Sequence, residues 1–207
     1  MTTDLDLLTL DYDHLLLRIP HYQVYPKMIP WVGKSYGNQS RKLLLVGESH
    51  YVGKVFTFHL DPAAWYAGVA TDGSQGFWTR ENISKGIRND WREKGATLYR
   101  NMDRALRNSS LFSPCRTNAF THVAFMNYFQ RPAEIYGDSI KVCGQDASVA
   151  QEVFREVVSV LNPDAVIFCS ALAYRHARKA GIPAFLKYRD VLFEQTAHAG
   201  MPWWNRI

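Results

Sequence analysis

The chain has 207 residues, enough for one sizeable domain, and its 47% hydrophobic and 21% charged residues are typical of a globular protein. The formal charge of +5 favours an anionic partner, and no apolar run approaches the ~20 residues that a membrane-spanning helix needs. The three cysteines (Cys115, Cys143 and Cys169) lack metal-type spacing, and we find no signal peptide, so we expect reduced thiols in a cytoplasmic protein.

The first forty residues are predicted to pack on the domain as a helix followed by a loop. Residues 3–19 have the apolar spacing of an amphipathic helix, and Pro20 is expected to end that helix. Residues 20–40 are rich in proline, glycine and aromatic residues, which predicts an aromatic loop without repeating structure. We favour a loop packed on the protein surface, and the alternative is an aromatic wall beside a binding site.

The next stretch, residues 42–51, has the strongest functional signal. Residues 42–47 are predicted to form a strand buried on both faces, because they contain an apolar run without alternation. Ligands of parallel α/β sheets bind outside the carboxyl ends of the strands, and a glycine there allows a close backbone approach. The polar cluster that follows this strand is therefore the leading candidate for a site. Its sequence is Gly47-Glu48-Ser49-His50-Tyr51.

Residues 52–79 are predicted to be mostly irregular. Asp61 and Pro62 are expected to open a short helix through Ala67. Phe58 is one of several aromatic side chains in this stretch that pack in the core or stack on a flat ligand.

Residues 80–107 are predicted to be helical, with an interruption at Gly95. They hold eight basic residues against four acidic ones. Arg88 and Arg92 share one face, which either binds the phosphates of a nucleic acid or is a solvated helix face.

The second half of the chain alternates between strands and helices. Helices are predicted over residues 146–161 and from the N-cap Ser170 through Ala180, with Gly181 after the helix. His122 is expected to be a core histidine within a strand. The strands are predicted near 118–127, 164–169 and 191–197. This alternation indicates one domain, a three-layer α/β/α sandwich with a mainly parallel sheet of about four strands.

Polar side chains follow three of the four predicted strands. Glu48, Ser49 and His50 follow the first strand, Asn127 ends the second, and His198 follows the fourth. Because the carboxyl ends of parallel strands meet at one edge of a sheet, we expect these side chains to line one pocket.

The order of these motifs resembles the uracil-DNA glycosylase superfamily over roughly residues 42–204. In that family a buried first strand precedes a motif such as GQDPYH or GEAPG, a second strand ends in a base-reading asparagine, and a late strand ends in an HPS-like motif. The corresponding stretches here are Gly47–Tyr51, Phe125-Met126-Asn127 and His198-Ala199-Gly200. The resemblance implies a glycosylase-like fold that binds DNA or another nucleobase-containing ligand. It also implies hydrolysis of the N-glycosidic bond of uracil or a damaged base, without a metal or other cofactor.

The resemblance implies a role for each matching residue. Tyr51 matches the tyrosine that excludes the thymine methyl group, and Asn127 matches the asparagine that pairs with the uracil edge. His198 matches the histidine that stabilises the departing uracil anion by oxyanion-type hydrogen bonding. Met201 matches the apolar wedge that replaces the flipped nucleotide, and Glu48 matches the glutamate of the GEAPG type.

Several positions depart from the family pattern. Ser49 stands where GQDPYH has the aspartate that positions water, and His50 stands where it has proline. The stacking phenylalanine has no clear match, and Phe58 and Trp65 are the nearest candidates.

These features lead to one main hypothesis and two alternatives. In the glycosylase hypothesis the catalytic candidates are Glu48, His50 and His198. The base-binding candidates are Gly47, Ser49, Tyr51, Phe58 and Asn127, and the DNA-binding candidates are Arg88, Arg92 and Met201. The first alternative is a non-catalytic protein that binds nucleic acid or a nucleotide. The second is a metal-dependent hydrolase in which Glu48, His50 and His198 hold a divalent ion.

Overall fold

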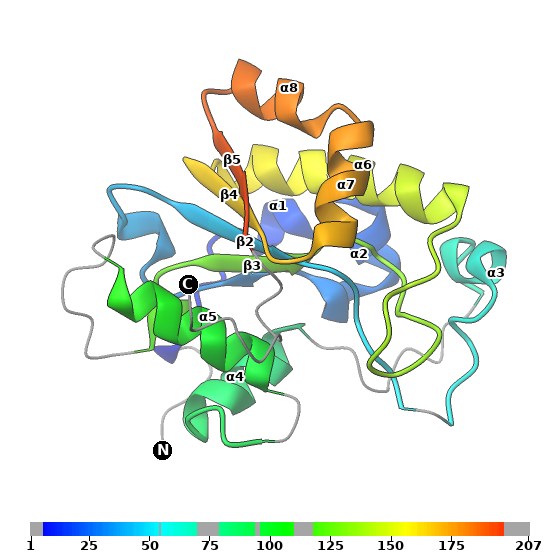
Figure 1. Ribbon diagram of the computed structural model, residues 1–207, viewed down its shortest axis with the longest axis horizontal. Helices are drawn as coiled ribbons and strands as arrows, with labels where there is room; N and C mark the ends of the chain where they lie inside the picture. The colour runs from blue at the N-terminus through cyan, green and yellow to red at the C-terminus, as the bar shows by residue number, and fades with distance from the viewer. Residues whose placement is uncertain (1–5, 54, 70–78, 94–95, 110–117, 197–207) are drawn as a thin grey trace.

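The computed structural model describes residues 6–53, 55–69, 79–93, 96–109 and 118–196. These residues form an α/β fold in which a five-stranded mixed sheet has helices on both faces (Figure 1). Within these ranges, no helix combines the length and the apolar character that crossing a membrane requires.

The sheet is built around β2 (Leu43–Gly47), which pairs in parallel with β3 (Ala124–Asn127) and with β4 (Ala165–Phe168). β5 (Leu192–Gln195) continues the parallel part beyond β4, and β1 (Trp31–Val32) pairs antiparallel with β3. The spatial order is β1-β3-β2-β4-β5. The strands predicted near 42–47, 164–169 and 191–197 are confirmed as β2, β4 and β5, whereas the prediction over 118–127 is confirmed only for its last four residues. The short antiparallel β1 makes the sheet larger and more mixed than expected.

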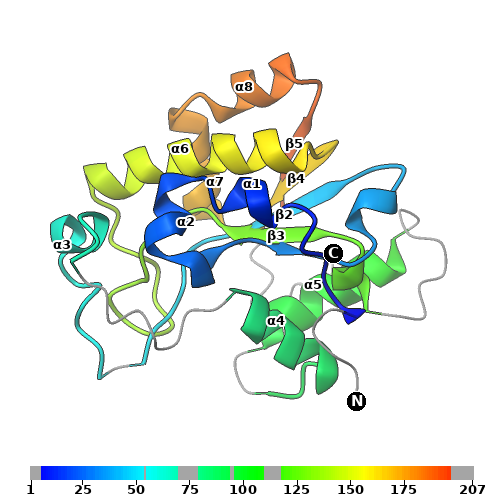
Figure 2. The ribbon, with the colours of Figure 1, turned by 180° about the vertical axis from the view of Figure 1, so that it is seen from behind.

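The helices lie in two groups. Figure 2 shows α1, α2, α6, α7 and α8 on one face of the sheet and α4 and α5 on the other. Their bounds are α1 (Asp13–Leu16), α2 (Pro20–Val24), α3 (Pro62–Tyr66), α4 (Thr79–Arg88), α5 (Thr97–Asn108), α6 (Gly144–Leu161), α7 (Ala171–Lys179) and α8 (Ile182–Tyr188).

Alternation along β2 divides the core between the two faces. Leu44 and Val46 pack with the cluster that contains α6 and α7, whereas Leu43 and Leu45 pack with the cluster that contains α4 and α5. All five residues of β2 are buried. A strand covered on both faces needs apolar side chains at every position, which explains the unbroken apolar run in the sequence. Burying each leucine stabilises the fold by roughly 1.5–3 kcal/mol.

The local signals for two helices are confirmed. The Ser170 hydroxyl accepts a hydrogen bond from the backbone N–H of Ala173 and so caps α7. Gly181, after α7, has a φ of +72°, in the left-handed region that favours glycine. The Asp61 carboxylate accepts hydrogen bonds from two backbone N–H groups and begins α3 as expected.

The prediction of one helix over residues 3–19 is wrong in the part that the structure describes. Leu8 forms a β-bridge with Gly33, so the chain is extended there, and among the described residues the first α-helix begins only at Asp13. Pro20 begins α2 instead of ending a helix, because proline lacks a backbone N–H and fits the first helical turn.

The aromatic segment 20–40 is also more ordered than predicted. It contains α2, β1 and two short 3₁₀ turns, Pro26–Met28 and Tyr36–Asn38. Its aromatic residues are part of the core and not of a surface loop; they are Tyr22, Tyr25, Trp31 and Tyr36.

Two further details differ from the sequence analysis. α8 was not predicted. His122 is not within a strand: it ends a 3₁₀ turn, Ala119–Thr121, and lies before β3. Its ring lies 3.1 Å from the Gln39 side-chain amide.

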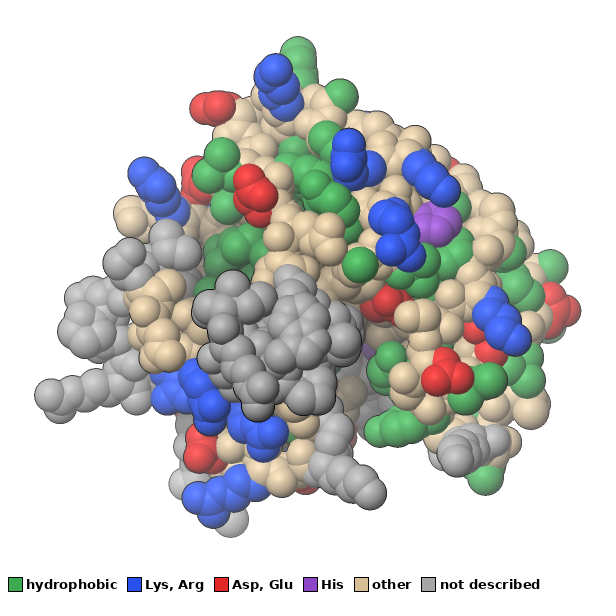
Figure 3. Space-filling model, viewed as in Figure 1, with side chains coloured by type: hydrophobic (Ala, Val, Ile, Leu, Met, Phe, Trp, Pro, Cys, Tyr) green, Lys and Arg blue, Asp and Glu red, His purple; other side chains and the backbone are tan. Residues whose placement is uncertain are grey.

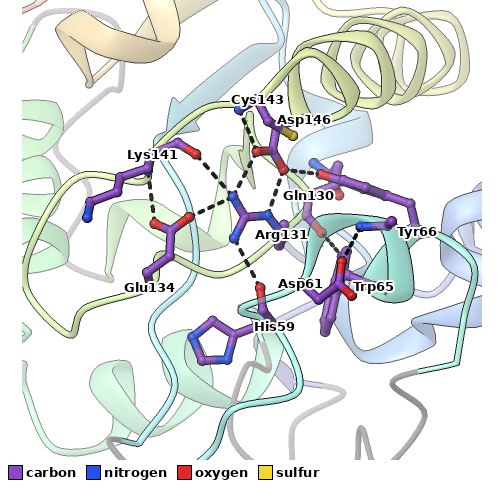
Figure 4. Close-up of polar contacts among 11 residues, drawn as sticks. His59, Asp61, Trp65, Tyr66, Gln130, Arg131, Glu134, Lys141, Cys143 and Asp146 are labelled. Carbon is purple, nitrogen blue, oxygen red and sulfur yellow. Dashed lines mark hydrogen bonds and ion pairs between the residues drawn. The ribbon is translucent and has the colours of Figure 1, made fainter.

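A fully buried arginine holds the chain that follows β3. The Arg131 guanidinium donates to the Asp146 carboxylate from Nε at 2.9 Å and from Nη2 at 2.8 Å. It also donates to the carbonyl oxygens of His59 and Lys141, and it forms an ion pair with Glu134 at 2.8 Å (Figure 4). A buried charge is tolerated when it is paired and hydrogen-bonded, so this network confines the loop between β3 and α6 to one arrangement.

Asp146 extends the network to two helices. Its Oδ2 accepts from the backbone N–H of Cys143 at the start of α6, and its Oδ1 accepts from the Tyr66 hydroxyl of α3 at 2.8 Å. Burial raises the pKa of the Asp146 carboxyl, but the hydrogen bonds it accepts, first from Arg131, outweigh burial and leave the pKa below its usual range.

We predict that Asp146→Asn destabilises the protein by about 3–5 kcal/mol, because it leaves the Arg131 charge buried without its main partner. The free energy of unfolding, measured by urea denaturation, tests this. Asp138→Asn removes an exposed carboxylate from the same loop and should change stability by less than about 0.5 kcal/mol. Equal effects of the two substitutions would contradict the prediction.

Candidate functional site

The candidate site lies at the carboxyl ends of the parallel strands. Along the chain, β3 is added on one side of β2 and β4 on the other, so the direction of winding reverses between β2 and β4. Ligands of open α/β sheets bind outside the carboxyl ends of the strands at such a switch point. Glu48 follows β2 and Ser170 lies just beyond β4, so both lie at this position.

A hydrogen bond joins these two strand ends. The Ser170 hydroxyl donates to Oε2 of Glu48 at 2.6 Å, across 122 residues of sequence. The other carboxylate oxygen, Oε1, is buried and has no hydrogen-bond partner among the described residues. Ser170 thus orients Glu48 so that one oxygen remains available to a ligand or water. The sequence identified Ser170 only as a helix cap, because no local pattern indicates its contact with Glu48.

Asn127, at the end of β3, lies directly against Gly47. A Cβ atom at Gly47 would overlap with Oδ1 of Asn127, so only glycine leaves room for the amide. The space beside Gly47, where a ligand was expected to approach the backbone, is filled by the Asn127 side chain. The Asn127 backbone carbonyl accepts a hydrogen bond from the Gln130 side chain at 2.7 Å, and the residue is only 8% exposed.

Two buried histidines lie beside this edge. Burial lowers the pKa of His50 to about 4. Burial also lowers the pKa of His21, to about 3, and the charge of His50 adds to the shift. Both rings are therefore neutral near pH 7. His21 comes from α2, and no sequence pattern pointed to it.

Ser49 and Tyr51 occupy different environments. Ser49 is buried, and its hydroxyl has no hydrogen-bond partner among the described residues. Tyr51 is 38% exposed, with its ring 5.5 Å from that of Tyr136. Burial raises the pKa of Tyr51, and the negative charge of Glu48 raises it further, which indicates that the phenol lies near the carboxylate.

Phe58 belongs to an aromatic stack at the side of the site. Its ring lies parallel to that of Trp65, with centroids 6.1 Å apart, and Trp65 stacks in turn on Tyr25 at 4.0 Å. The Trp65 indole donates to the carbonyl of Gln130, which ties the stack to the segment after β3. Tyr25 is buried in the core, so within residues 20–40 it supports this stack from inside the protein.

The remaining candidates are not brought to this edge by the described contacts. His198 and Met201 lie outside the described residues. Arg88 ends α4 and Arg92 follows it, and both are exposed. In the part of the chain that the structure describes, no group of three or more His, Cys, Asp or Glu side chains is placed to hold a metal ion.

The sequence matches no protein-family model and no curated protein.

We predict that Gly47→Ala displaces the Asn127 side chain, because the new methyl group overlaps with its Oδ1. The strand is packed on both faces, so a loss of about 1–3 kcal/mol in stability should accompany the shift. The displacement can be followed by NMR as a change in the Asn127 side-chain amide resonances. An unchanged Asn127 signal would contradict the geometry.

We also predict that stability falls as the pH is lowered from about 6.5 towards 4. His21 and His50 have folded-state pKa values below the ordinary 6.5, so protons bind preferentially to the unfolded chain. Their stabilisation is present above the unfolded pKa and is lost as the pH falls, by up to about 1.4 kcal/mol per pH unit for each histidine.

Urea denaturation between about pH 7 and pH 5 measures this slope. His50→Gln should reduce it by up to about 1.4 kcal/mol per pH unit. His14→Gln removes an exposed histidine and serves as the control. A slope unaffected by His50→Gln would show that folding does not lower the pKa of this ring.

Proposed function

We propose that this edge of the sheet binds a nucleobase in DNA, and that the chain is a uracil-DNA glycosylase-like protein that hydrolyses the N-glycosidic bond of uracil or a damaged base. The single observation that supports this most is that two polar groups lie at the carboxyl ends of the neighbouring strands β2 and β3. One is Asn127, an amide packed on Gly47. The other is Glu48, a carboxylate held by Ser170 through one oxygen only.

These two groups suit the two halves of the reaction. An amide offers both a donor and an acceptor, which a uracil edge requires, so Asn127 is the group that reads the base. Breaking the glycosidic bond moves its electron pair to the base and leaves a cationic sugar, to which water adds. Glu48 is the carboxylate that stabilises this cation and accepts the proton of the attacking water. The proton then passes to the base.

The other residues contribute according to their environment. A neutral His50 can donate a hydrogen bond without adding charge, and the resemblance gives the same role at the departing base to His198. Tyr51 is the group that excludes the thymine methyl. Phe58, which is partly exposed, provides an aromatic face beside the base, and the buried Trp65 supports Phe58 from behind. Gly47 and Ser49 border the base, Gly47 by leaving room for Asn127.

A non-catalytic base-binding protein is the second candidate. Ser49 favours it, because a hydroxyl replaces the carboxylate that positions water in the GQDPYH motif. In this case Glu48 and Asn127 would bind the ligand but no bond would break.

Excision of uracil from single-stranded DNA under single-turnover conditions separates the two functions. We expect Glu48→Gln to lower the excision rate about 10²–10⁴-fold, because glutamine keeps a polar partner for Ser170 but cannot act as the general base. Glu152→Gln, at an exposed carboxylate on α6, is the matched control. His198→Ala should lower the rate about 10²–10³-fold. Ser49→Asp should keep or raise it.

The outcomes are distinct. The glycosylase function is supported if the wild type excises uracil, Glu48→Gln abolishes excision and Glu152→Gln does not. Binding of uracil-containing DNA without excision, by the wild type and by Ser49→Asp, would support the non-catalytic protein. No preference for uracil-containing DNA in either assay would overturn the proposal.

A further inference from the structure

The exposed face of α7 carries three cations without a counter-charge. Arg175, Arg178 and Lys179 stand at positions i, i+3 and i+4, opposite the buried Ala173 and Ala177. Within the described ranges none of the three forms an ion pair, and residues 171–190 contain five basic residues but only one acidic residue. Figure 3 shows Lys and Arg side chains gathered over α7.

The cations near α4 and α5 have different surroundings. Arg80 pairs with Asp13 at 2.7 Å, and Lys85 pairs with Glu93 at 3.0 Å. The guanidinium of Arg107 lies 2.7 Å from a carboxylate oxygen of α5. Three of the eight cations in this segment therefore have a carboxylate partner among the described residues, whereas none of the three cations on α7 has one.

Helix stability explains only part of the α7 pattern. Cations in the last turn interact favourably with the helix dipole, which accounts for Arg178 and Lys179. Arg175 lies one turn earlier, where this effect has faded. Like charges at i, i+3 and i+4 repel by roughly 0.2–0.5 kcal/mol per pair, so Arg175 next to the other two costs stability unless an anion is bound.

α7 is attached directly to the candidate site. Ser170 caps the helix and donates to Glu48. The backbone N–H of Phe129 donates to the Glu48 carbonyl at 2.9 Å, and the Phe129 ring contacts the His176 ring at 5.4 Å. Arg175 is adjacent to His176 and lies about 7 Å along the helix axis from Ser170. A DNA strand whose nucleobase reaches Glu48 would thus pass over α7.

We propose that the face formed by Arg175, Arg178 and Lys179, the α7 basic face, binds phosphates of the DNA strand whose base enters the pocket. The inference rests on the proposed function and adds the path of the backbone. The guanidinium groups donate paired hydrogen bonds to phosphate oxygens, and the lysine adds a point charge.

Binding of a fluorescein-labelled, uracil-containing single-stranded oligonucleotide at several salt concentrations tests this. Arg175→Ala with Lys179→Ala should raise Kd at low salt roughly tenfold and reduce the slope of log K against log salt by about 1.4, the value for two lost phosphate contacts on a single strand. Arg175→Lys with Lys179→Arg keeps both charges and should keep the slope.

A matched control removes the same two charges elsewhere. Lys34 and Arg41 are exposed, and they lie at the opposite edge of the sheet, after β1 and before β2. Lys34→Ala with Arg41→Ala should leave the slope unchanged. A third pair, Arg88→Ala with Arg92→Ala, tests the competing face at α4. Thermal unfolding midpoints no lower than that of the wild type ensure that all variants are folded.

Each outcome has one meaning. A selective loss in the α7 pair supports the α7 basic face. Equal losses in the α7 and control pairs show that net charge alone governs binding, and a larger loss in the α4 pair places the backbone there; either result overturns the inference. If the wild type prefers uracil-containing over thymine-containing DNA, and the α7 double variant binds it as tightly as the wild type does, only this inference is overturned. Wild type without affinity for either oligonucleotide overturns the proposed function and this inference together.

Discussion

The arrangement of this protein depends on the full burial of one charge. Arg131 follows β3 by a few residues, and its guanidinium can remain in the interior only if every nearby acceptor is in place. This requirement joins the loop after β3 to α3 through Tyr66 and to the first turn of α6 through Asp146. The same loop begins at Asn127, so the network also positions the edge of the sheet where the candidate site lies.

The candidate site combines a rigid, fully buried strand with polar groups that lack hydrogen-bond partners among the described residues. β2 is buried on both faces, and the chain changes from apolar to polar within one residue of its end. Ser170 has two tasks there, because one hydroxyl both caps α7 and orients Glu48. Buried oxygen atoms of Glu48 and Ser49 without partners among the described residues cost free energy, and a ligand or bound water would relieve that cost.

Much of the sheet could be predicted, because buried parallel strands leave a strong local pattern. The apolar runs at residues 43–47 and 165–168 each became a strand, and Ser170 began its helix where its side chain can cap. The amino-terminal segment could not be predicted in this way. Leu8 is extended because its neighbours Leu7 and Thr9 hydrogen-bond to the backbone on either side of Gly33. The aromatic residues near Tyr22 are buried because α6 and the sheet cover them. Those contacts are distant in sequence and leave no periodic signal.

The sequence by itself determined which residues form the central strands and that polar groups follow them, because hydrophobic periodicity and capping act over a few residues. Only the tertiary structure decided which polar groups meet. The contact of Ser170 with Glu48, the overlap that reserves Gly47 for Asn127, and the burial of His21 beside His50 all arise from packing between distant segments. Charge followed the same division: the sequence counted the cations, but only the fold showed which of them have carboxylate partners, because ion pairs form through space and not along the chain.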